Sequence, residues 1–356
     1  MKSRAAQLLR RVPWAGSALM LIVPLLVLAT AIDLYDDLML ERIVINMFVS
    51  VILVVGLQLF TGNSGVVSFG HISFMAIGAY TSVLLIMSPD KKAYTLPYLT
   101  GPLSEIALPF IPGILLAALF TAVLAALVGF PLMRLSGSAA TMATFALLII
   151  THVILINADT YTRGTRTMYG LDNYTTLWVS VFWGIIAIIG GFLFKESRVG
   201  LMLRASREQG EAAAAIGVNI VRVRWVAFIV SAFISALGGA VWAHFICSIS
   251  PYTMYMHTTF LTVAMLIVGG TGSVSGAVVG AVAITGLFEA LRATEIWIST
   301  FRIAGQTAAG FTEVFLGAAM VLLMVLRPYG LMVGREVRLP ARWRRKLGPA
   351  TGKSAG

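Results

Sequence analysis

The sequence contains only one cysteine, Cys247, and few charged residues: 12 % of its 356 positions are Asp, Glu, Lys or Arg. One cysteine excludes a disulfide framework or a cysteine-ligated zinc site within the chain. The four histidines are scattered and have no metal-ligand spacing. Soluble domains are about a quarter charged. The low charge and the mean hydropathy of +0.90 therefore indicate a chain largely solvated by lipid.

The motifs of nucleotide hydrolysis and metal hydrolysis are also missing. GxxxxGK[ST], HExxH, CxxC and GxSxG do not occur, and the glycine-rich GGTGSVSG has no lysine to hold a phosphate. We therefore expect no catalytic residue, metal or cofactor on this chain. The apolar stretches also lack the Asp, Glu or His that ion-coupled carriers place inside the bilayer. An ion-coupled secondary transporter of small polar solutes, or a membrane scaffold or enzyme, stays an alternative.

Apolar runs near the 20 residues that cross a bilayer predict an all-α, polytopic integral membrane protein. The weakest of about ten candidate transmembrane helices are the third, eighth and ninth. The first follows basic residues and resembles a secretory signal, but its apolar run is long, so we expect it to be retained. The ten are Trp14–Ile32, Ile43–Phe60, Val66–Met87, Phe110–Leu132, Ala139–Ile156, Trp178–Phe194, Trp225–Ile246, Tyr252–Val268, Gly276–Leu291 and Phe311–Leu326.

The basic residues predict the orientation. With the N-terminus in the cytoplasm and the spans alternating, 19 of the 26 Lys and Arg residues fall inside. We expect a cytoplasmic N-terminus (1–13), a transmembrane domain (14–326) with a cytoplasmic loop (195–224), and a basic cytoplasmic tail (327–356). The net charge of +11 is thus explained by the membrane surface, and no nucleic-acid partner is expected.

Two glycine-rich polar segments, 60–85 and 268–286, interrupt the apolar pattern. Small residues allow helices to approach closely, and Gly276 and Gly280 form a GxxxG pair. The segments are therefore either tight packing sites or broken helices that line a translocation path. His71 is either hydrogen-bonded structure or a proton relay. The candidate path residues are Gly62, Asn63, Gly65, Ser68, Gly70, His71, Gly269, Gly270, Gly272 and Ser273.

The segment LMLRASREQGEAAAAIGVN, residues 201–219, is too polar to span the membrane. On one continuous helix, Arg204, Arg207, Glu208 and Glu211 would share a face and form two i,i+4 ion pairs. Gly210 would weaken this helix and either kink it or split it in two, and Gly217 would end it. The alanines at 212–215 would present a flat surface. This helix either lies at the interface between spans or docks a cytoplasmic partner, and the missing P-loop favours docking.

Four stretches together resemble the branched-chain amino acid permeases of ABC importers, of the LivM type. These are TGNSGVVSFGHISFMAIGAYTSVLL, the region from SRVGLMLRASREQGEAAAAIGVN to SALGGAVWAH, GGTGSVSGAVVGA, and RPYGL. The resemblance covers roughly residues 40–333. The sequence departs from the family where Ala214 replaces a frequent acidic residue, Gly210 a common charged one, and Val66 a frequent glutamine.

The resemblance implies a multi-pass protein of the bacterial inner membrane with both termini cytoplasmic. It implies a second permease subunit, two ATP-binding subunits that carry ATP and Mg, and a periplasmic binding protein. The cargo would be a branched-chain or related amino acid, with amides or urea as an alternative. The residues expected to contact the ATPase, or to hold the coupling helix in its groove, are Arg204, Arg207, Glu208, Glu211, Ala214 and Gly217.

Overall fold

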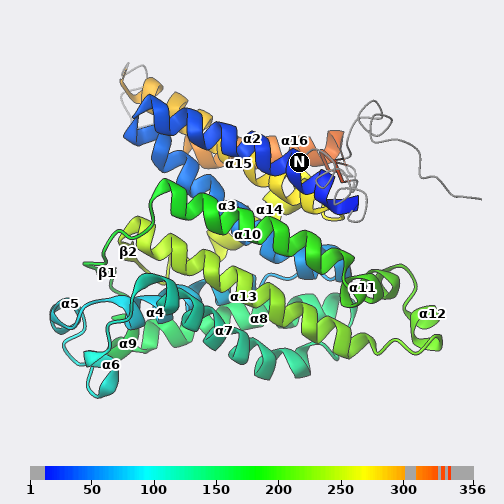
Figure 1. Ribbon diagram of the computed structural model, residues 1–356, viewed down its shortest axis with the longest axis horizontal. Coiled ribbons are helices and arrows are strands. Elements are labelled where there is room, and N and C mark those ends of the chain that lie inside the picture. The colour runs from blue at the N-terminus through cyan, green and yellow to red at the C-terminus, as the bar shows by residue number, and fades with distance from the viewer. Residues whose placement is uncertain (1–12, 301–309, 328–329, 333–335, 338–356) are drawn as a thin grey trace, which may run out of the picture.

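The computed structural model describes residues 13–300, 310–327, 330–332 and 336–337. Most of the predicted N-terminal segment (1–13) and of the predicted tail (327–356) lies outside these ranges. Within them, longer helices run back and forth through a bundle (Figure 1). They are α2 (Pro13–Tyr35), α3 (Leu38–Ser64), α4 (His71–Ile86), α7 (Phe110–Leu132), α8 (Gly137–Asn157), α10 (Leu177–Glu196), α13 (Ile220–Ile246), α14 (Met256–Gly269), α15 (Val274–Thr300) and α16 (Phe311–Leu326).

Short elements occupy the two ends of the bundle (Figure 1). At one end, β1 (Met168–Tyr169) pairs antiparallel with β2 (Ser248–Ile249). The helices α5 (Pro89–Thr95), α6 (Pro102–Glu105) and α9 (Asp159–Thr162) lie at this β1–β2 end. At the opposite end, α11 (Arg198–Glu208) and α12 (Gly210–Ala215) project from the bundle. We call this the α11–α12 end.

The predicted fold class is confirmed, whereas the span count stays approximate. Seven helices of the described chain are long and apolar enough to cross a membrane. The apolar helices α4, α14 and α16 are shorter, and α4 begins at His71 because the residues from Gly65 to Gly70 are not helical. The third and eighth predicted spans are short, as expected. The ninth, α15, is the least apolar of the seven long helices, but it extends well beyond Leu291 and is long enough to span.

Helices α3 and α13 form the centre of the bundle. Buried residues make up 83 % of the most apolar stretch of α3 and 72 % of that of α13, compared with 33 % for α2 and α8. Helix α4 packs closely on α13, since a Cβ added to Gly239 would lie 2.0 Å from the Met75 carbonyl oxygen. A Cβ on Gly78 would similarly lie 2.5 Å from the Ala236 carbonyl oxygen. Only glycine permits this backbone contact.

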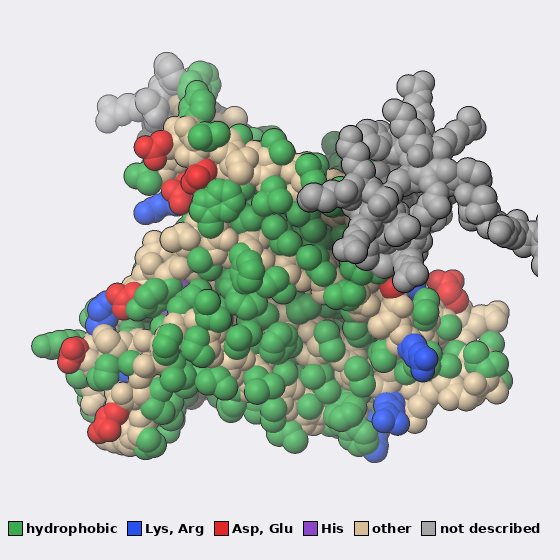
Figure 2. Space-filling model, in the orientation of Figure 1, with side chains coloured by type: hydrophobic (Ala, Val, Ile, Leu, Met, Phe, Trp, Pro, Cys, Tyr) green, Lys and Arg blue, Asp and Glu red, His purple; other side chains and the backbone are tan. Residues whose placement is uncertain are grey.

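Charge separates along the bundle as the sequence predicts. Apolar side chains cover the middle of the face in Figure 2, and charged side chains lie near its two ends. Most described acidic residues lie at the β1–β2 end, where Asp37 caps α3 by accepting a hydrogen bond from the Met39 amide at 2.8 Å. The segment 195–224, which runs from the end of α10 through α11 and α12 to the start of α13, is basic, with Lys195, Arg198 and Arg222 among its residues. An apolar belt between two charged ends is the surface of a protein that crosses a bilayer.

Candidate functional site

The segment 201–219 forms two helices, so the helix that the sequence predicts here is split beside Gly210. Ser197 begins α11 by accepting a hydrogen bond from the Gly200 amide at 3.1 Å. The backbone of Gln209 is extended, with φ −147° and ψ 98°, so α11 ends at Glu208 and α12 starts at Gly210. The break places Glu211 on α12, whereas the other three charged residues lie on α11. The single charged face was therefore a wrong prediction.

Neither predicted i,i+4 ion pair forms, because both arginines contact the membrane bundle. The ion pairs within the described residues are Lys91–Asp172 and Lys195–Glu336. Arg204 donates through Nη2 to the Lys195 carbonyl oxygen at 3.0 Å, and Arg207 donates through Nη1 to the Gly62 carbonyl oxygen. Gly62 is in the last turn of α3, where helical carbonyls lack intrahelical partners and attract cations. Arg207 therefore joins α11 to the end of α3.

The acidic and alanine positions form the exposed side of the helix pair. Glu208, Glu211 and Ala214 are exposed, whereas Ala213 is buried. Ile216 is 78 % exposed, which the sequence pattern did not indicate. Small and apolar side chains beside two carboxylates make a surface that another protein can approach closely. We call Glu208, Glu211, Ala212, Ala214, Ala215 and Ile216 the exposed coupling face.

Gly217 ends α12 as predicted. Its φ is +89°, in the left-handed region that glycine adopts without strain. Its amide donates to the Ala214 carbonyl oxygen at 2.9 Å, and the Val218 amide donates to that of Ala213 at 3.0 Å. These two bonds form a Schellman motif, the common glycine-terminated end of a helix. The motif fixes the direction in which the chain returns to α13.

The first glycine-rich segment closes α3 and begins α4. The Asn63 side chain donates through Nδ2 to the Leu59 carbonyl oxygen at 2.9 Å, and Gly65 caps α3 with φ +76°. The Ser68 amide donates to Thr61 Oγ1 at 3.3 Å, which ties the connection to the helix that it leaves. Gly70 packs on α8, since a Cβ there would lie 2.8 Å from the Thr144 carbonyl oxygen. This segment is therefore an ordered break between two helices.

His71 is part of a buried hydrogen-bonded chain. Its Nδ1 lies 2.8 Å from Ser68 Oγ and its Nε2 lies 2.5 Å from Ser231 Oγ. Ser231 in turn donates to the Gly56 carbonyl oxygen at 2.5 Å. Both ring nitrogens therefore have partners, Ser68 in the α3–α4 connection and Ser231 on α13. This geometry supports the structural interpretation of His71 over a proton relay.

The second glycine-rich segment separates α14 from α15. Gly269 ends α14, and a Cβ on Gly269 would lie 2.0 Å from the Gly276 carbonyl oxygen. A Cβ on Gly280 would lie 2.0 Å from the Met265 carbonyl oxygen, so the GxxxG pair packs α15 directly on α14. Buried Ser273 accepts a hydrogen bond from the Gly276 amide at 3.0 Å at the start of α15. Tight packing and a break between helices thus occur together.

The two glycine-rich segments meet at the α11–α12 end. A Cβ on Gly62 would lie 2.3 Å from the Thr271 carbonyl oxygen, so the end of α3 touches the α14–α15 connection. Lys195, at the end of α10, donates to the Gly272 carbonyl oxygen at 3.2 Å. Arg207 donates to Gly62 from α11. The structure therefore brings residues from both segments into contact with the helix that leads to the exposed coupling face.

A segment of the predicted tail also belongs to this cluster, although the sequence pattern gave no indication of it. The amides of Leu331 and Met332 donate to the carbonyl oxygens of Val268 and Gly269, at 2.8 and 3.1 Å. Glu336 accepts hydrogen bonds from the amides of Val274 and Ser275, each at 3.0 Å. Its carboxylate therefore caps the positive end of α15. We call residues 330–332 and 336–337 the C-terminal strap.

Glu336 also forms the ion pair with Lys195, and both side chains are largely buried. Burial raises the pKa of the Glu336 carboxyl, but the Lys195 ammonium and the hydrogen bonds from Ser275 outweigh this effect. The net result is a pKa below the ordinary value. The carboxyl is thus ionised at neutral pH and connects the strap to α10. The RPYGL motif just before it was the nearest sequence signal.

The described residues contain no group of three or more His, Cys, Asp or Glu that could hold a metal ion. The notable feature of the α11–α12 end is instead a structural connection. An exposed pair of short helices connects through Arg207 to two breaks in the membrane bundle. Apolar spans and a projecting helical pair define a polytopic membrane protein with an exposed helical surface at one end.

The chain belongs to the family of permease components of branched-chain amino acid transport systems, whose model it matches over residues 39–326. The LivM permease protein of the high-affinity branched-chain amino acid transport system of Salmonella typhimurium is 26 % identical over 339 residues, 86 % of this chain and 72 % of LivM. LivH of the same organism is 23 % identical over 80 % of this chain and 92 % of its own length. A probable LivH of Methanocaldococcus jannaschii is 26 % identical over 84 % of this chain and 93 % of its own length. No solved structure matches.

Proposed function

We propose that this permease component imports a branched-chain or related amino acid, driven by ATP that partner subunits hydrolyse. The family match over most of the spans carries the proposal. The substrate class is that of the transport systems named for LivM and LivH. Two ATP-binding subunits, a second permease subunit and a periplasmic binding protein complete the assembly that the proposal requires.

The α11–α12 end is cytoplasmic in this proposal. The positive-inside rule supports the assignment, since the loop from 195 to 224 is the longest basic connection between spans. The acidic β1–β2 end then faces the periplasm, where a binding protein would deliver its ligand. Both chain termini lie on the cytoplasmic side in this arrangement.

The exposed coupling face is the contact for the ATP-binding subunit. Glu208, Glu211 and Ala214 are exposed, whereas the guanidinium groups of Arg204 and of the likewise exposed Arg207 hydrogen-bond to the bundle. We therefore divide the predicted coupling residues into a contacting set and a transmitting set. A displacement of α12 reaches α11 across Gln209, and Arg207 conveys it to the last turn of α3. Thr271 lies against that turn, so the α14–α15 connection moves with it.

The experiment is leucine uptake into proteoliposomes that contain the complete transporter and a loaded binding protein. Uptake should require internal ATP and should fall sharply when Glu208 and Glu211 are both replaced by lysine. Glu196→Lys is the matched control, because Glu196 is exposed in the same loop but outside the coupling face. Uptake that runs on an ion gradient without ATP would support the secondary-transporter alternative instead. ATP-dependent uptake of urea or amides, but not of leucine, would correct the substrate.

A further inference from the structure

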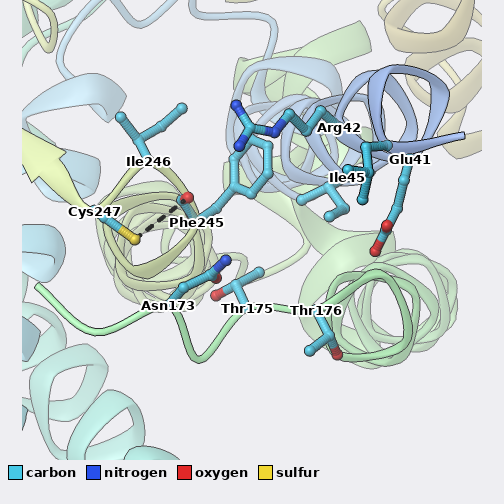
Figure 3. A pocket seen from close by; sticks show the side chains of 10 residues that line it. Glu41, Arg42, Ile45, Asn173, Thr175, Thr176, Phe245, Ile246 and Cys247 are labelled. Atoms are coloured by element: carbon cyan, nitrogen blue, oxygen red, sulfur yellow. Dashed lines mark hydrogen bonds between the residues drawn. The ribbon is translucent and has the colours of Figure 1, made fainter.

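A cavity of about 470 Å³ opens at the β1–β2 end, far from the coupling face. It lies between the first turns of α3, the loop before α10 and the last turn of α13 (Figure 3). Small-molecule sites usually have volumes of about 300–1,000 Å³. The cavity is therefore large enough for an amino acid and lies on the side where such a ligand would arrive.

Two opposite charges line this cavity without neutralising each other. Glu41 and Arg42 are successive residues of α3, so their side chains leave the helix about 100° apart. Figure 3 shows the two side chains directed to different parts of the cavity. Within the described residues, neither side chain forms an ion pair or a hydrogen bond. A carboxylate and a guanidinium on one wall are complementary to a ligand that carries both charges.

The remaining wall combines hydroxyl groups with apolar surface. Thr176 lines the cavity from the loop before α10, while Ile45 and Phe245 line it from α3 and α13 (Figure 3). The Thr175 hydroxyl already has a partner within the protein, since it donates to the Val241 carbonyl oxygen at 2.9 Å. The polar and apolar parts thus lie side by side, as an amino acid with an aliphatic side chain would require.

We propose that this cavity is an outer binding site for the zwitterion of an aliphatic α-amino acid. Arg42 holds the carboxylate, Glu41 and the Thr176 hydroxyl hold the ammonium, and Ile45 and Phe245 contact the side chain. The proposal rests on the proposed function, because it assigns the place where released substrate first meets this chain. It does not involve the α11–α12 end.

The single cysteine of the chain provides the readout, because Cys247 lines the same cavity and is partly exposed. In the complete transporter without binding protein, the rate at which a small maleimide modifies Cys247 is followed by mass spectrometry. Millimolar leucine should slow the modification several-fold. The analogues 4-methylpentanoate, which lacks the ammonium, and 3-methylbutylamine, which lacks the carboxylate, should protect far less.

Substitutions then test the assigned roles. Arg42→Gln and Glu41→Gln should each raise the half-protecting concentration of leucine about tenfold or more. Arg166→Gln and Glu105→Gln make the same changes at the same end of the bundle, outside the cavity, and should leave protection intact. If Cys247 resists modification, Ile246→Cys provides an exposed position that lines the cavity.

The outcomes separate this inference from the proposed function. ATP-driven leucine uptake without leucine protection of the cavity would overturn the binding site and leave the function standing. Leucine protection without ATP-driven uptake would overturn the function and leave an amino-acid site. Equal protection by leucine and by 3-methylbutylamine would overturn the role of Arg42.

Discussion

Lys195 and Glu336, 141 residues apart in the sequence, form an ion pair at the α11–α12 end. The pair joins the last turn of α10 to the C-terminal strap. Glu336 also caps α15, so one carboxylate links three parts of the chain. A link between the start of the coupling loop and a break in the bundle has consequences for stability and for transport.

Replacing Glu336 with glutamine should destabilise the protein by roughly 1–3 kcal/mol, because Lys195 loses its charged partner in a buried site. The measurement is the melting temperature of the purified transporter at pH 7. Glu196→Gln removes a neighbouring exposed carboxylate and should change stability by less than about 0.5 kcal/mol. Equal effects of the two substitutions would contradict the role of the ion pair.

The same carboxyl predicts a pH dependence. The pKa of the Glu336 carboxyl is lowered in the folded state. Its contribution to the stability of the fold is therefore complete above the ordinary glutamate pKa of about 4.3 and is lost as the pH falls through the folded pKa. The difference in melting temperature between the native protein and Glu336→Gln should therefore be constant from pH 7 to about pH 5 and shrink below it. A difference in melting temperature that grows on acidification would show that the pKa of Glu336 is raised in the folded state rather than lowered.

Gly62→Ala should perturb the contact between the two glycine-rich segments. The added Cβ would lie 2.3 Å from the Thr271 carbonyl oxygen, which can move only with the backbone. We expect a destabilisation of roughly 1–3 kcal/mol and reduced uptake. Gly286→Ala is the matched control, because no heavy atom lies within 4 Å of its added Cβ and alanine favours the helix. Unchanged uptake in Gly62→Ala would show that this contact is not needed for transport.

Arg207→Gln should reduce uptake several-fold while the ATP-binding subunits stay attached, because Arg207 holds the bundle rather than the partner. Uptake and co-purification of the ATP-binding subunits are measured on the same preparations. Arg198→Gln, at an exposed position in the first turn of α11, should preserve both. Loss of the ATP-binding subunits from Arg207→Gln alone would place this side chain in the contacting set.

Ala214→Trp should release the ATP-binding subunits, in contrast to Arg207→Gln, which should keep them. A large side chain on the exposed coupling face would prevent close approach, so the ATP-binding subunits should be lost while the permease remains folded in the membrane. Co-purification and the melting temperature distinguish the two effects. Ala139→Trp, at an exposed position near the start of α8 at the same end, is the control. Normal assembly with Ala214→Trp would remove α12 from the interface.

The sequence predicted the long helices well, because an apolar run near the length of a bilayer leaves few alternatives to a spanning helix. The sequence did not predict side-chain contacts between residues that lie far apart along the chain. Arg207 was paired with Glu211 on a continuous helix, yet its acceptor is Gly62, 145 residues away. The break at Gln209 decided this outcome; Gly210 beside it signals a weak point in the helix but not the acceptor that Arg207 finds. Glu336 was missed because the tail around it resembles a solvated basic end.

The glycine contacts within the bundle also determine how it can move. Helices α4 and α13, and likewise α14 and α15, meet backbone against backbone, with no side-chain layer between them that could repack. Each pair therefore behaves as a rigid body, and a sliding motion inside either pair would separate carbonyls from glycines. Helix α3 packs against both pairs. In the proposed transport cycle, we expect relative motion between the two pairs to occur along α3, away from the Gly62–Thr271 contact that ties its last turn to the α14–α15 connection.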